Sequence, residues 1–167
     1  MILENCVVGD TLVSASGENA GGMIGSGYCV SLLSCFQLGM SGNPSSKVVT
    51  SKSGGAGGLA GVVSESFKVE ESGVEGGRVE TRERESCGGG VVGKSLSEEL
   101  FFSRTYVTDR TTVFSSKSAG LAGCLEGAGS LEMEHCFSLA SPQGEEAQGQ
   151  VIGVFDMRGN HSISSCK

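Results

Sequence analysis

The sequence predicts an all-β fold, a parallel β-solenoid (β-helix-like) built from about five repeats of roughly 30 residues. Three observations predict it. A glycine-rich step returns at nearly constant spacing, a pair of apolar and small positions moves in step with it, and no apolar run is long enough for a helix. Residues 1–167 are therefore expected to form a single repeat domain.

The glycine-rich step consists of two small residues, two apolar residues and a closing glycine. Its copies lie 36, 32, 30 and 30 residues apart. Glycine adopts the positive φ angles that tight turns require, so each step is expected to be a turn. The closing glycines are Gly25, Gly61, Gly93, Gly123 and Gly153.

A second landmark is an apolar residue followed, three positions later, by a small residue of the kind that is usually buried. Its copies are spaced by 29, 37, 33, 31 and 30 residues, so the two landmarks drift together. In a solenoid they become two columns that run up the stack. The pairs are Leu3 and Cys6, Leu32 and Cys35, Val69 and Ser72, Phe102 and Thr105, Met133 and Cys136, and Ile163 and Cys166.

The third landmark is a short β-prone run between the other two. Residues 11–13, 47–50, 78–80 and 111–113 form it, and polar loops of variable length follow, such as 51–55 and 115–118. Three runs per unit predict a coil with three faces, with neighbouring coils ~4.8 Å apart. A β-sandwich or a fragment of a propeller is the alternative fold.

The composition excludes several classes of partner. The formal net charge is −7, which disfavours nucleic acid and anionic membrane surfaces. No run approaches the ~20 apolar residues of a membrane span, so membrane insertion is not expected. The opening residues 1–6 lack the basic region and apolar stretch of a signal peptide. The hydrophobic fraction of 38% indicates a folded chain rather than glycine-rich disorder.

The segment 2–9, continued by Ala20-Gly21-Gly22-Met23-Ile24-Gly25, resembles the GLUG-motif repeats of large bacterial surface proteins, among them adhesins and IgA-cleaving proteases. Residues 57–61 and 119–123 carry the same signature. The resemblance covers nearly the whole chain and implies an extracellular or cell-surface β-solenoid that is not itself catalytic. The seven cysteines depart from that family, whose repeats are generally poor in cysteine.

The cysteines divide into two groups. Cys6, Cys35, Cys136 and Cys166 share one repeat position, where Ser72 and Thr105 also stand. We expect a buried ladder there, in which cysteine serves as a small apolar residue. Disulfides between neighbouring coils and a metal site are the alternatives. The remaining three, outside this ladder, are Cys29, Cys87 and Cys124.

No catalytic, cofactor-binding or metal-binding residue is assigned. His135 and Cys136 are neighbours on an expected strand, so their side chains should point to opposite faces and cannot act as a nucleophile and its base. His161 stands apart from both. The carboxylates are expected to lie on a solvated surface, and they are Glu98, Glu99, Glu132, Glu134, Glu145, Glu146 and Asp156.

Three further motifs carry no assigned function. The run 88–95 ends in Gly-Lys-Ser, like a phosphate-binding loop, but it is in register with four steps that lack Lys-Ser. Asn160-His161-Ser162 is a glycosylation sequon. A regular Thr-x-Thr ladder would indicate an ice- or mineral-binding face. The threonines cluster in one repeat only, at Thr105, Thr108, Thr111 and Thr112.

Both ends of the chain fall at the same phase of the repeat, and no capping segment is recognised. We therefore expect part of a longer array, with a structural or adhesive role as a stalk or display rod. The partners would be further copies through the solenoid ends, or a surface glycan or protein ligand. One alternative is a filament subunit that stacks end to end. Another is a polysaccharide-active β-helix enzyme, with carboxylates from adjacent coils converging on one groove.

Overall fold

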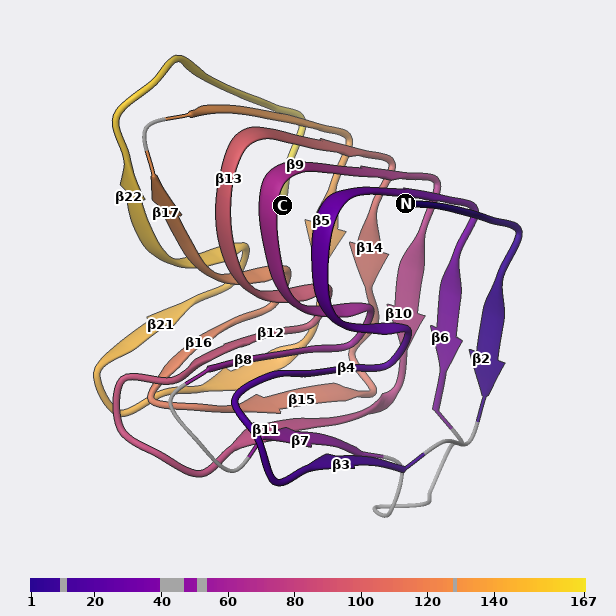
Figure 1. The fold of residues 1–167 in the computed structure, drawn as a ribbon, viewed down its shortest axis with the longest axis vertical. Coiled ribbons are helices and arrows are strands. Elements are labelled where there is room, and N and C mark those ends of the chain that lie inside the picture. The colour runs from indigo at the N-terminus through magenta and orange to yellow at the C-terminus, as the bar shows by residue number, and fades with distance from the viewer. Residues whose placement is uncertain (10–11, 40–46, 51–53, 128) are drawn as a thin grey trace.

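The computed structural model describes residues 1–9, 12–39, 47–50, 54–127 and 129–167. It is all-β in those residues, and every pair of neighbouring strands is parallel. The chain winds through stacked coils, which confirms the parallel β-solenoid (Figure 1). Of the predicted features, Thr11 and residues 51–53 lie outside the described residues.

Four sheets run along the stack, so the prediction of three strands and three faces per coil is wrong. Sheet A has eight strands and the other three have five each. The strands of sheet A are β1 (Ile2–Glu4), β5 (Ile24–Leu33), β9 (Ala60–Glu70), β13 (Val92–Ser103), β17 (Ala122–Gly127), β18 (Ser130–Glu134), β22 (Ile152–Met157) and β23 (His161–Ser164).

Sheets B and C follow sheet A in each coil. The strands of sheet B are β2 (Val7–Gly9), β6 (Phe36–Leu38), β10 (Gly73–Glu75), β14 (Tyr106–Val107) and β19 (Phe137–Ser138). The strands of sheet C are β3 (Val13–Ala15), β7 (Lys47–Thr50), β11 (Gly77–Thr81), β15 (Thr111–Phe114) and β20 (Ser141–Gln143). The predicted β-prone runs at 47–50, 78–80 and 111–113 thus lie in sheet C.

Sheet D is the sheet that the sequence did not predict. Its strands are short and rich in glycine and alanine, and they lead into the glycine-rich steps. They are β4 (Ala20–Gly21), β8 (Gly55–Gly57), β12 (Cys87–Gly89), β16 (Lys117–Ala119) and β21 (Ala147–Gly149).

The long strands of sheet A curve around the upper part of the coil in Figure 1, and the opposite side is closed by sheet B. The bend is marked by register shifts between Tyr28 and Val30 in β5 and between Ser97 and Glu99 in β13. In the last two coils the two arms are separate strands, β17 with β18 and β22 with β23.

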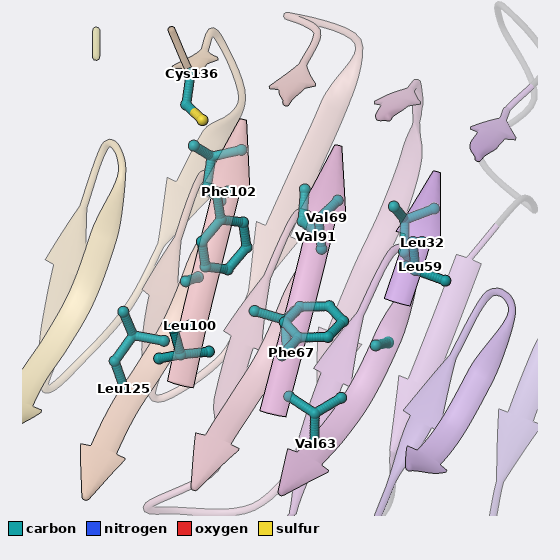
Figure 2. Packing of buried hydrophobic residues seen from close by; sticks show 14 of the residues in the cluster. Leu32, Leu59, Val63, Phe67, Val69, Val91, Leu100, Phe102, Leu125 and Cys136 are labelled. Carbon is teal, nitrogen blue, oxygen red and sulfur yellow. The ribbon is translucent and has the colours of Figure 1, made fainter. Parts of the chain in front are cut away.

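The main core fills the space between the two arms of sheet A and sheet B (Figure 2). Phe67 and Phe102 are fully buried there, with ring centroids 5.7 Å apart in an edge-to-face arrangement. A second, small core of Ala56, Val79 and Val113 lies between sheets C and D. Apart from these two rings, the cores consist mainly of Val, Leu, Ala and Cys side chains, so a chain with only 5% aromatic residues can fill its interior.

The predicted apolar column is confirmed residue by residue. Consecutive members are paired in the sheet A register, and the four central ones are fully buried. The members are Leu3, Leu32, Val69, Phe102, Met133 and Ile163. Because the register is fixed by which residues face the core, this column sets the alignment of every coil.

The glycine-rich steps connect sheet D to sheet A. Their second residue is glycine in four coils, and a Cβ added there would overlap the carbonyl oxygen of the same position in the next coil. These residues are Gly22, Gly58, Gly90 and Gly120. The prediction that the step glycines adopt positive φ angles is wrong, because the glycines with positive φ are Gly76, Gly77 and Gly127, which lie outside the steps. Glycine is required instead by the close approach of successive turns, and this contact explains the repeat.

Candidate functional site

The outward face of sheet B carries a row of apolar and aromatic side chains, one from nearly every coil. Phe137 is 41% exposed and Leu139, just beyond β19, is 61% exposed. Val7 and Leu38 extend the exposed surface to the first two coils. We call the set of Val7, Phe36, Leu38, Tyr106, Phe137 and Leu139 the sheet B row. Exposed apolar side chains gathered on one face are a feature of interaction sites.

Tyr106 is the centre of the sheet B row. Its ring stacks on Phe137 with centroids 5.5 Å apart and 13° between the planes, and it lies 6.2 Å from Phe36. Gly73, between Phe36 and Tyr106 in the sheet, leaves room for the ring, because a Cβ there would come within 2.6 Å of it.

The hydroxyl of Tyr106 donates a hydrogen bond to the Glu75 carboxylate. Partial burial and the negative charge of Glu75 raise the pKa of Tyr106 to about 12. The phenol therefore remains a neutral donor, and the row has a polar edge beside its apolar surface. Five residues each come directly after a member of the predicted small-residue column, so their alignment in the sheet could have been predicted from the sequence. They are Val7, Phe36, Gly73, Tyr106 and Phe137.

The small-residue column forms one corner of the coil. The residue before each member has a left-handed backbone with φ between 46° and 53°, although none is glycine. Each member then donates a side-chain hydrogen bond to the carbonyl two positions earlier, at 2.7–3.4 Å. The donors are Cys6, Cys35, Ser72, Thr105, Cys136 and Cys166.

These hydrogen bonds give the column a physical reason that the sequence interpretation missed. A left-handed non-glycine residue costs roughly 1–2 kcal/mol, and a hydrogen bond contributes about 1 kcal/mol. Cysteine at this corner is thus a small donor as well as a small apolar residue. Burial raises the pKa of Cys35 and raises that of Cys136 to about 11, which keeps both thiols protonated.

The disulfide joins two cysteines outside this column. Cys87 in β12 is bonded to Cys124 in β17, with Cα atoms 5.6 Å apart, and both are buried. The bond therefore connects one coil to the next, which was one of the alternatives predicted from the sequence. It joins sheet D to sheet A. The free cysteines are Cys6, Cys29, Cys35, Cys136 and Cys166.

One group of potential metal ligands contains the same two cysteines. The sulfur atoms of Cys87 and Cys124 and a carboxylate oxygen of Glu126 lie within 4.8 Å of one another. The sulfur atoms are bonded to each other, and Glu126 forms an ion pair with Lys94 at 2.8 Å. With the disulfide formed and the ion pair in place, all three potential ligand atoms already have partners.

The two histidines are not brought together with a nucleophile. His135 is the exposed left-handed residue of a corner, with φ 53°, and Cys136 beside it is buried. The prediction placed both residues on a strand, and this is wrong, because they lie at the corner between β18 and β19. The corner turns His135 outward and Cys136 inward. His161 contacts the Met157 carbonyl at 3.2 Å and the ring of Phe155 at 4.7 Å.

The carboxylates are mostly exposed, but adjacent coils place two of them around one hollow of about 260 Å³. Glu99 of β13 and Glu132 of β18 line it together with Lys68 and Phe101. Lys68 is also paired with Glu70 at 2.9 Å.

The segment 88–95 is part of β12, a turn and the start of β13, so it leads into a strand and not into a helix. The side chain of Lys94 binds Glu126, and Ser95 is buried with its hydroxyl on Ser97. This geometry differs from a phosphate-binding loop, in which backbone N–H groups at the start of a helix hold the phosphate.

Within the described residues there is no helix of the length and apolar character needed to cross a bilayer. In comparisons with protein-family models, curated proteins and solved structures, nothing matches this chain.

Proposed function

We propose that this chain is a non-catalytic structural and adhesive repeat segment of a secreted or cell-surface protein, of the GLUG-motif type. The observation that carries the proposal is the sheet B row, which extends over coils held in register by a continuous core. Its exposed members, such as Phe137 at 41% and Leu139 at 61%, lose contact with water only if a partner covers them.

The disulfide supports the proposed location. A bond between two buried cysteines in adjacent coils persists in an oxidising compartment and is rare in the cytosol. The coils would supply a rigid support, and the sheet B row would contact a surface glycan or protein.

Adhesion is tested with beads that carry the protein at equal density, under flow over plates coated with glycans, collagen or fibronectin. Wild-type beads should be retained on at least one coating, and the double variant Phe137→Ser, Leu139→Ser should lose most of that retention. The matched control is Leu96→Ser, Phe155→Ser, which removes a Leu and a Phe of similar exposure, 46% and 44%, from sheet A. Equal loss in both variants, or no retention of wild-type beads, would contradict an adhesive role of this row.

A polysaccharide-active enzyme is the second candidate, favoured by the hollow that Glu99 and Glu132 line together. Two carboxylates on one groove can act as acid and base on a glycosidic bond. Release of reducing ends from neutral and acidic polysaccharides, abolished in both Glu99→Gln and Glu132→Gln, would support this candidate. No release from any of them would leave the adhesive proposal in place.

A further inference from the structure

Cys87 and Cys124 belong to two columns that face each other where sheet D meets sheet A. In the sheet D register, Cys87 lies next to Gly55. In the sheet A register, Cys124 lies next to Lys94, and Lys94 lies next to Val62. A Cβ added at Gly55 would come within 2.9 Å of the Val62 side chain, so the two columns are also in contact one coil earlier. The two cysteines therefore meet between the sheets and are not part of the main core.

Glu126 brings a carboxylate to the same contact. It lies two positions beyond Cys124 in β17, so both side chains leave the same face of the strand. One of its carboxylate oxygens is within 4.8 Å of both sulfur atoms. Its Oε2 atom accepts the Lys94 ammonium group at 2.8 Å, and this ion pair orients the carboxylate toward the cysteines. Among the residues that the structure describes, this is the one place where three potential metal ligands lie so close together.

Reduction of the disulfide converts these groups into a set of ligands. A dithiol supplies two electrons and two protons, the Sγ–Sγ bond breaks, and the dithiol leaves as its own disulfide. Two sulfur atoms that bind one zinc ion tetrahedrally at ~2.3 Å lie ~3.8 Å apart. The Cα atoms are 5.6 Å apart, so the two thiols can reach that separation by rotation about their Cα–Cβ bonds. The side chain of Glu126 is 33% exposed, which leaves access for a water molecule as the fourth ligand.

The charges around the two cysteines favour cation binding by the reduced state. Lys117 lies next to Cys87 in sheet D, as Lys94 lies next to Cys124 in sheet A. Ammonium groups beside a thiol favour the thiolate, which is the form that binds a metal. Two thiolates, one carboxylate and a divalent cation together leave one negative charge, and the ion-paired Lys94 offsets it.

We propose that Cys87, Cys124 and Glu126 form a redox-controlled site for a thiophilic divalent cation such as zinc. In the oxidised state the two coils are joined by the disulfide. In the reduced state, and before the disulfide first forms, the cation joins the same coils through three side chains and displaces the two thiol protons to the solvent. The site gives a role to two cysteines that stand outside the predicted cysteine ladder.

The test compares zinc binding by the oxidised and the reduced protein in equilibrium dialysis. The protein is reduced with dithiothreitol, which is then removed under argon because it binds zinc itself, and the thiols are counted, seven after reduction against five before. The reduced wild type should bind one Zn²⁺ per chain more than the oxidised wild type. The variant Cys87→Ser, Cys124→Ser keeps the other five thiols and should show no increase after the same treatment.

The variant Glu126→Gln tests the third ligand. It should weaken zinc binding by the reduced protein roughly tenfold or more, since the loss of even an outer-shell partner of a metal ligand has that effect. The matched control is Asp156→Asn, because Asp156 is the exposed carboxylate next to Glu126 in the following coil, and this variant should bind zinc as the wild type does.

Four results would each overturn the site. They are equal zinc binding by oxidised and reduced wild type, an increase in the double serine variant, wild-type affinity of Glu126→Gln, and a reduced chain that lacks the circular dichroism spectrum of the oxidised protein even with Zn²⁺ present. The last result counts because the site requires both coils in place. None of these measurements involves a coated surface, so their outcome is independent of the adhesive role.

Discussion

Cys87 and Cys124 are bonded across two coils and two sheets, from β12 of sheet D to β17 of sheet A. The bond closes a loop of 37 residues, which is longer than one full coil, since Lys117 is the residue that lies on Cys87 in the next coil. It therefore restricts the unfolded chain and also fixes the glycine-rich turn between the two sheets.

Removal of this disulfide should destabilise the protein by about 4 kcal/mol, because the chain-entropy relation gives that value for a loop of this length. Urea unfolding of the wild type, with and without reductant, measures the change. The variant Cys87→Ser, Cys124→Ser should unfold, with and without reductant, at the urea midpoint of the wild type whose disulfide has been reduced. An unaltered midpoint after reduction would show that the bond does not restrict unfolding.

Gly90→Ala should destabilise the fold by about 2 kcal/mol, since its Cβ would overlap the Gly120 carbonyl and approach Val107 to 2.8 Å. Gly25→Ala is the control, because the nearest atom to a Cβ there is 3.7 Å away. Thermal unfolding of the two variants should separate them by several degrees. Equal stability would mean that the turns move apart without cost.

Thr105→Val should cost about 1 kcal/mol, because valine has the shape of threonine but cannot donate to the Ser103 carbonyl. Thr105→Ser and Thr105→Cys retain a donor, and both residue types already stand in this column. They should lie closer to the wild type than valine does. Chemical denaturation of the three variants gives the order, and a valine variant as stable as the serine variant would reject the donor role of the corner.

Alkaline pH should destabilise the wild type more than Cys136→Ser. Burial, together with the neighbouring Cys166, raises the pKa of the Cys136 thiol from 9.0 to about 11. A folded-state pKa above the unfolded value contributes stability that is fully present below pH 9 and is lost as the pH rises through about 11. Melting temperatures measured across this window should converge for the two proteins, whereas a constant difference would contradict the shift. The raised pKa of Tyr106 acts equally in both and cancels in the comparison.

The alignment of the coils could be predicted from the sequence because each residue of the apolar column occupies the same place in its coil. Leu32, Val69 and Phe102 meet in the sheet A register as the spacing predicted. Sheet D could not be predicted, because runs such as 55–57 consist of glycine and alanine, which have low β propensity. Those strands exist because the sheets on either side bury them.

The candidate sites also differ in how far the sequence predicts them. The sheet B row follows from a column that the sequence already contains. The contact of Cys87 with Cys124 depends on how sheet D folds against sheet A, and no spacing in the chain carries that information.

The left-handed corners have a consequence for variation. The side-chain donor of each corner fixes the backbone, so the residue before it need not be glycine. Asparagine, serine, glutamate, arginine and histidine all occupy it, and Glu71 and Arg104 form an ion pair at 2.7 Å between successive coils. The edge is thus a linear array with one replaceable side chain per coil at ~4.8 Å intervals, on which charges or reactive groups can be exchanged without altering the scaffold.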